Sequence, residues 1–178
     1  MPVEELLSLD DPAHYKRPLA TLTDLGLSRK IDPENPQLVT RCGSEDYVPP
    51  ELLMGQPYDG RQTDSWALGV LLYAVMEGRL PFDPPKNVGG GRSRGRTAHR
   101  IARVEWSWIA FKNDPPQEKL PYSEEWVGGM EIVEGCLQKR DLRLRAVDIA
   151  EMPWVKKAVC ELERSDLLPV SDIFVDGD

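Results

Sequence analysis

The sequence has few of the features that mark several common functional classes. Its three cysteines are widely spaced and form no Cys-x-x-Cys pair, so neither a disulfide framework nor a zinc site is expected. The longest apolar run, Trp66 to Met76, is too short to cross a bilayer, and no secretory signal pattern opens the chain. Acidic residues exceed basic ones, and the formal net charge of -8 disfavours binding to nucleic acid or anionic membranes. These absences favour a cytoplasmic or nuclear protein without a transmembrane segment.

What is present indicates a globular domain. The 178 residues are 40% hydrophobic and 29% charged, which fits one ordinary domain or a large piece of one. The polar stretch from Asp24 to Val48 contains two prolines and little periodicity, so it predicts a long loop, which is usually functional when it lies inside a compact domain. Two short apolar stretches precede it and predict a β-hairpin, at Leu6–Ser8 and Leu19–Leu22.

The rest of the chain is predicted to be mainly helical. The strongest prediction is a helix over Trp66–Met76, with Thr63 or Asp64 as its cap and Gly78 at its end. Because nearly every position in it is apolar, this helix is expected to be buried on all sides. Other helices are predicted to begin at Pro49–Glu51 and to cover His99–Trp108, Ser123–Leu137, Ala146–Glu151 and Pro153–Glu163. A flexible glycine- and arginine-rich insert is expected at 86–97 and a frayed acidic tail at 165–178.

Four segments in a fixed order carry a family resemblance. They are Asp24-Leu25-Gly26, then Cys42-Gly43-Ser44 with Pro49-Pro50-Glu51, then Asp64-Ser65-Trp66, and finally Asp141 and Arg145 with Met152-Pro153-Trp154. Together they resemble the C-terminal lobe of a eukaryotic protein kinase of the Ser/Thr, calcium/calmodulin-kinase-like branch. The resemblance covers roughly Glu4 to Val159, so residues 1–164 are expected to form a partial kinase domain, mainly α, without an N-terminal lobe.

The resemblance implies a role for several residues. Asp24 would bind magnesium that bridges the phosphates of ATP, and Gly26 would allow the backbone to turn; taken alone, Asp-x-Gly also fits a simple turn. Glu51 and Arg145 would form a buried ion pair that ties the loop to the helical core. Asp64 would accept hydrogen bonds from the catalytic loop, although it also fits a helix cap. The remaining assignments are Ser44 as a substrate-facing hydroxyl, Thr40 as a regulatory phosphorylation site and Glu5 as a second magnesium ligand.

Other parts that such an enzyme needs are not found in these 178 residues. There is no His-Arg-Asp catalytic loop and no glycine-rich loop before Asp24, so the resemblance places the catalytic base before residue 1. No catalytic residue is therefore assigned, and the isolated chain is expected to be inactive.

Three readings of function remain open at this point. The first is a truncated protein Ser/Thr kinase that would use ATP and Mg²⁺ to phosphorylate protein hydroxyls. The second is a pseudokinase-like scaffold, with a partner that covers the surface left by the missing lobe, and the third is a truncated gene model. An arginine cluster within residues 92–103 fits either a docking site for an acidic partner or a solvated insert. Trp106, Trp108 and Trp126 fit either an aromatic cage for a ligand or, more commonly, packing in the core.

Overall fold

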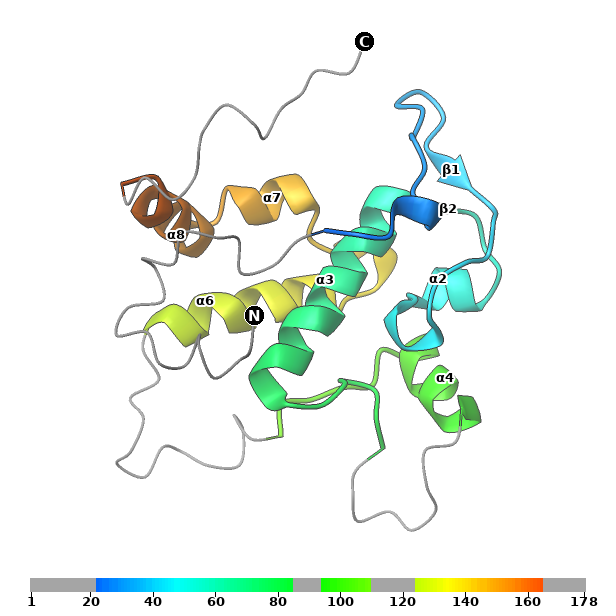
Figure 1. The fold of residues 1–178 in the computed structure, drawn as a ribbon. Coiled ribbons are helices and arrows are strands. Elements are labelled where there is room, and N and C mark those ends of the chain that lie inside the picture. The colour runs from blue at the N-terminus through cyan, green and yellow to red at the C-terminus, as the bar shows by residue number, and fades with distance from the viewer. Residues whose placement is uncertain (1–21, 85–93, 110–123, 165–178) are drawn as a thin grey trace.

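The computed structural model describes residues 22–84, 94–109 and 124–164, and within them the chain is mainly helical, as predicted (Figure 1). The short elements of the N-terminal half are β1 (Gln37–Leu38), α2 (Pro50–Leu53), β2 (Tyr58–Asp59) and two 3-10 turns at Leu25–Leu27 and Glu45–Tyr47. The helices that follow are α3 (Gly60–Glu77), α4 (Arg94–Ala102), α6 (Glu124–Cys136), α7 (Ala146–Ala150) and α8 (Pro153–Arg164), with a 3-10 turn at Arg140–Leu142.

Helix α3 runs through the middle of the molecule, with α6 on one side and the α2 and α4 helices on the other (Figure 1). It begins earlier than predicted, because the Asp59 side chain accepts a hydrogen bond from the Arg61 amide at 3.0 Å and so caps the first turn. Thr63 and Asp64 lie inside the helix, and neither is its cap. The predicted end is confirmed: Gly78 adopts a left-handed conformation at φ 66°, which glycine accepts without strain.

The core forms where α3 packs against α6. Trp66, Val70 and Tyr73 are fully buried on α3 and meet Val133 from α6 and Leu137, the residue after it. Gly69 permits the close approach of the two helices, since a Cβ there would lie only 2.5 Å from the Cβ of Cys136. The two backbones can therefore lie nearer to each other than larger side chains would allow.

One face of α3 contradicts the prediction of burial on all sides. Leu68 is 40% exposed, Leu71 51% and Val75 72%. Their spacing of three and four residues places them on one stripe of the helix. The apolar composition of α3 thus serves the core on one side and leaves an apolar stripe on the other.

A cluster of three aromatic rings packs beside the end of α3. Tyr73 stacks on Trp108 at 5.2 Å between ring centroids, and Trp106 meets both rings edge-on. The Tyr73 hydroxyl donates to the carbonyl of Ser107 at 2.9 Å, and burial raises the pKa of Tyr73 to about 12. The expected use of Trp106 and Trp108 in packing agrees with these contacts, whereas Trp126 is 42% exposed and does not belong to this core.

Several predicted boundaries differ from the structure. Helix α4 already includes 94–97, which were assigned to the flexible insert, and it ends at Ala102 because Val104 takes a left-handed φ of 55°. Trp106 and Trp108 therefore lie after the helix. The sheet pairs β1 with β2 in antiparallel register, Leu38 opposite Tyr58. The hairpin predicted at Leu6–Leu22, the rest of the insert and the acidic tail fall outside the described residues, apart from Leu22, which is not in a strand.

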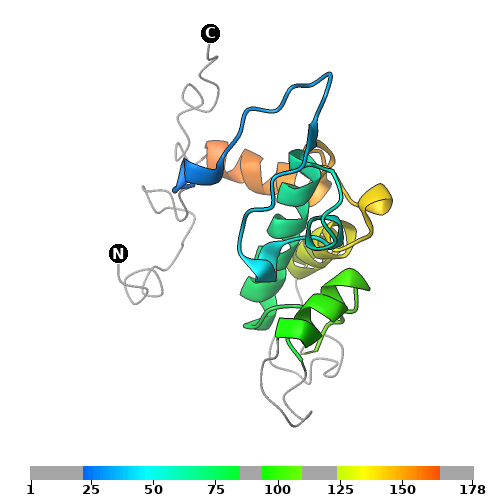
Figure 2. The ribbon, with the colours of Figure 1, turned by 90° about the vertical axis from the view of Figure 1, so that its right-hand side faces the viewer.

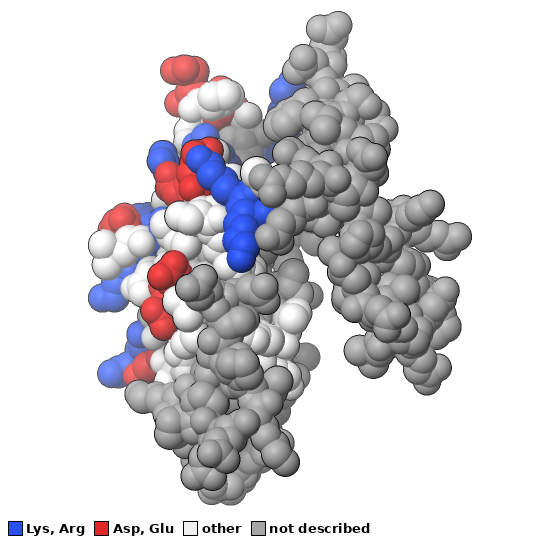
Figure 3. Space-filling view, turned by 90° about the vertical axis from the view of Figure 1, so that its left-hand side faces the viewer, with Lys and Arg blue, Asp and Glu red and all other residues white. Residues whose placement is uncertain are grey.

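Two surface observations bear on partners. Among the described helices, none is both long enough and apolar enough to cross a membrane. On the face shown in Figure 3, acidic and basic side chains of the described residues interleave, and neither sign gathers into one large patch. The described residues of that face therefore create no broad field of one sign for a highly charged partner.

Candidate functional site

A buried ion pair fastens the end of the long loop to the helical core. Both guanidinium Nη atoms of Arg143 donate to the carboxylate of Glu51, at 2.7 and 3.1 Å, and the two side chains are 0% and 4% exposed. Arg143 also donates to the carbonyls of Gln62 and Gln138 and lies 5.0 Å from the centre of the Trp66 ring. The N–H groups of Arg143 thus bond acceptors in three separate segments. These bonds offset the free-energy cost of removing the two charges from water.

The predicted partner of Glu51, Arg145, is wrong by two positions. Arg145 instead donates to Asp148 at 2.7 Å, and both side chains are partly exposed, 68% and 39%. Asp148 also accepts a bond from the Arg145 backbone amide, so the two residues form a local cap at the start of α7. One sequence signal could have identified the correct arginine. Asp148 follows Arg145 by three residues at the start of a helix, and this spacing predicts a local pair between them. Arg143 then remains as the partner of Glu51.

The segment that begins at Asp24 leads away from the core and returns to it at Pro49 (Figure 2). Asp24 is exposed and takes the left-handed conformation, φ 58° and ψ 60°, whereas Gly26, which was expected to allow the turn, has no positive φ. Leu25 is 62% exposed and so provides no apolar anchor. Asp24 thus offers one accessible carboxylate, while Glu5 lies outside the described residues; no group of three or more metal-ligating side chains occurs in the described part of the chain.

Ser44 and Asp64 line the same cavity. This cavity has a volume of about 340 Å³, and Tyr58, Cys42 and Thr63 also contribute to its wall. Partial desolvation raises the pKa of Asp64, although the residue is exposed at its outer edge. The structure therefore brings together two of the predicted site residues from separate segments, and Asp24 is not among the residues of this wall.

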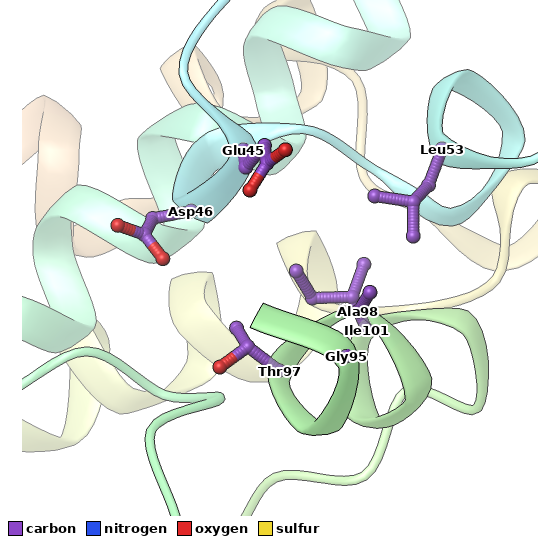
Figure 4. A pocket seen from close by; sticks show the side chains of 7 residues that line it. All are labelled: Glu45, Asp46, Leu53, Gly95, Thr97, Ala98 and Ile101. Atoms are coloured by element: carbon purple, nitrogen blue, oxygen red, sulfur yellow. The ribbon is translucent and has the colours of Figure 1, made fainter. Parts of the chain in front are cut away.

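A larger cavity of about 600 Å³ separates the loop from α4 (Figure 4). Glu45 and Asp46 lie on the loop side, with Leu53 from the end of α2 beside them. The opposite wall is formed by α4, which contributes Gly95, Thr97, Ala98 and Ile101. The cavity therefore has two acidic residues on its loop side and mostly small or apolar residues on its α4 side. Sequence reasoning missed it because the start of α4 had been assigned to a solvated insert.

Thr40, the predicted regulatory residue, lies in the stretch that joins β1 to this loop. It is exposed, and its carbonyl accepts a hydrogen bond of 2.5 Å from the Tyr58 hydroxyl. Burial and the neighbouring Cys42 thiol raise the pKa of Tyr58, so the hydroxyl stays protonated and able to donate at neutral pH. The next residue, Arg41, donates to the carbonyl of Leu53 at 2.7 Å.

Comparison with known proteins shows which family this chain resembles. The Protein kinase domain family matches residues 10–155. Serine/threonine-protein kinase PRR1 of Saccharomyces cerevisiae is 43% identical over 147 residues, which are 83% of this chain and 26% of that protein. The human NUAK family SNF1-like kinase 1 is 44% identical over 115 residues, 61% of this chain and 16% of that protein. The Schizosaccharomyces pombe kinase ppk27 is 37% identical over 117 residues, 63% and 27% of the two chains. The chain thus spans about a quarter of the two yeast relatives.

Proposed function

The chain belongs to the protein kinase domain family, and we propose that it serves phosphoryl transfer from Mg-ATP to serine and threonine hydroxyls of proteins. The observation that carries this proposal is the buried pair of Glu51 and Arg143, which pins the end of the 24–49 segment to the core. The Ser44 loop, fixed in this way, lies between two cavities. A segment anchored at one end and open to two cavities suits the binding of a protein substrate.

The metal and nucleotide would be held at the start of this segment. Asp24 supplies a hard, exposed carboxylate oxygen of the kind that magnesium prefers, and we assign Glu5 as a second oxygen donor. Magnesium bound to ATP supplies charge neutralisation of the transferring phosphoryl group. Among the described residues, Asp24 is the one that we assign as a ligand of magnesium, and it supplies one of the oxygen atoms that the ion needs from the protein.

We assign the substrate side to the loop between Cys42 and Tyr47. Ser44 would face the reacting hydroxyl, and the cavity between Glu45 and α4 would receive the flanking residues of the substrate. Phosphorylation of Thr40 would add negative charge beside Arg41 and regulate the order of this loop. The three cysteines are free thiols, and Cys42 and Cys160 are exposed. Free exposed thiols favour a location in the reducing cytoplasm or nucleus.

Taken alone, the 178-residue polypeptide is expected to transfer no phosphate. Its sequence has no His-Arg-Asp, the catalytic loop whose aspartate accepts the substrate proton. The alternative function is a scaffold that binds partners without catalysis, favoured by the apolar stripe that α3 exposes.

A chimera tests the proposal. In it, this chain replaces the matched stretch of the yeast relative PRR1, and transfer of radiolabelled phosphate to a serine- and threonine-containing peptide library is measured. We expect transfer by the chimera and a loss of about a hundredfold or more in Asp24→Ala, since a group that stabilises developing charge is worth that much. The unmodified relative is the positive control. An inert chimera beside an active relative, or an Asp24→Ala chimera of full activity, contradicts the proposal and favours the scaffold.

A further inference from the structure

Residues 37–41 are fastened to the stretch Leu53–Asp59 by three separate contacts. The β1–β2 pairing is only two residues long, with Gln37 opposite Asp59 and Leu38 opposite Tyr58. Beyond it, the Tyr58 hydroxyl donates to the Thr40 carbonyl at 2.5 Å, and Arg41 Nη2 donates to the Leu53 carbonyl at 2.7 Å. A ladder this short is weak by itself, so the two side-chain bonds matter for its order.

The Arg41 guanidinium also lies against the turn that follows α2. A Cβ on Gly55 would lie 3.7 Å from Arg41 Nη1 and 3.9 Å from its Cζ, which is ordinary van der Waals contact. Gly55 has a φ of 70°, a backbone conformation that glycine adopts without strain. Arg41 therefore reaches across to a turn whose backbone exposes the Leu53 carbonyl.

The bond from Arg41 to Leu53 joins the two ends of the stretch that contains the loop Cys42–Tyr47, which we assign to substrate binding. Arg41 lies three residues before Ser44, and its acceptor belongs to Leu53, whose side chain lines the cavity beside Glu45 and Asp46. The bond closes a ring of backbone from 41 to 53. The turn at Glu45–Tyr47 lies inside that ring, so its position relative to the wall of the cavity depends on the closure.

We propose that Arg41 is a positioning residue, which holds the loop carrying Ser44 against the end of α2 so that a protein substrate meets a preformed surface. This inference rests on the proposed function and names a residue that the family resemblance did not assign. Arg41 touches neither substrate nor metal in this role. It acts through the loop.

Hydrogen exchange of the full 178-residue chain tests the contact directly. Arg41→Met keeps an unbranched but shorter side chain and removes its donors, while Arg41→Lys keeps a cationic donor group. We expect exchange of the amides of 43–48, including the Tyr47 amide that bonds the Ser44 carbonyl, to accelerate about three- to tenfold in Arg41→Met. Arg41→Lys should restore part of this protection. Arg103→Met is the matched control, because Arg103 is an exposed arginine paired locally with Glu105. Exchange rates that stay within twofold of wild type in Arg41→Met overturn the proposal.

Kinetics of the chimera separate positioning from general destabilisation. With Arg41→Met we expect the KM for the peptide substrate to rise about three- to tenfold, with the KM for ATP and kcat unchanged, and Arg41→Lys to recover much of the loss. Equal effects on the KM for ATP, or a fall in kcat alone, overturn the positioning role. A wild-type chimera without activity refutes the proposed function, and the hydrogen-exchange comparison then still decides whether Arg41 holds the loop.

Discussion

At the scale of single residues, two arginines two positions apart have opposite environments. Arg143 is enclosed by Trp66, Glu51 and two backbone carbonyls, whereas Arg145 lies at the surface with Asp148. The resemblance predicted the kind of ion pair and its glutamate. It could not choose the arginine, because burial of a guanidinium depends on segments that are some 80 or more positions away in sequence.

Replacing each arginine should separate the two environments. Arg143→Met is expected to lower the free energy of unfolding by about 3–5 kcal/mol, because Glu51 would stay buried without its partner. Arg145→Met should leave the free energy of unfolding almost unchanged, as expected for an exposed pair. Urea unfolding followed by circular dichroism measures both. The buried-pair assignment fails if the two variants lose the same stability, and Glu51→Leu combined with Arg143→Met should recover part of the loss.

At the scale of elements, the boundaries of some helices were predicted closely and those of others were not. The apolar periodicity of α6 and the proline at the start of α8 indicate their positions to within a residue or two. The start of α3 was missed because Asp59 caps it from within a strand, and the end of α4 was missed because Val104 adopts a conformation rare for a β-branched residue. Both errors arise from backbone geometry that side-chain patterns do not record.

Two glycines test how closely α3 and α6 pack. In Gly69→Ala the new methyl group would lie 2.5 Å from the Cβ of Cys136, and we expect a loss of about 1–3 kcal/mol from overpacking. In Gly129→Ala on α6 the new methyl group would meet the flexible end of Met76 at 3.4 Å and Trp154 at 4.0 Å, and the change should be neutral or gain up to about 1 kcal/mol from helix propensity. Thermal unfolding of the two variants provides the comparison. Equal effects would mean that the two helices are not held at this spacing.

At the scale of the whole molecule, the sequence indicates the family and the helical class but not which surfaces meet. Ser44 and Asp64 were assigned separate roles, and they share a cavity wall; the roles of Asp24, Glu5 and Thr40 stay predictions. The wall formed by α4 was not anticipated, because Leu53 and Ile101, which line this cavity together, come from segments that share no local pattern. Likewise, a uniformly apolar α3 cannot reveal which of its faces stays exposed.

The exposed stripe of α3 leads to a prediction about solubility. Leu71→Glu and Val75→Glu should reduce aggregation and binding of the dye ANS while changing the free energy of unfolding by no more than about 0.5 kcal/mol. Val70→Glu, on the buried face of the same helix, should unfold the protein instead. Light scattering and dye fluorescence of the purified variants measure the effect. The stripe is not a sticky surface if both exposed variants aggregate as much as the wild type.

The sharing of Arg143 among Glu51, Gln62 and Gln138 has a thermal consequence. One side chain joins α2, the start of α3 and the stretch after α6, so none of these can loosen without disturbing the others. Warming should therefore abolish loop order and helical packing in a single step. Substitutions far from Ser44 that merely weaken the core should then lower the temperature of this single step, which circular dichroism on heating measures.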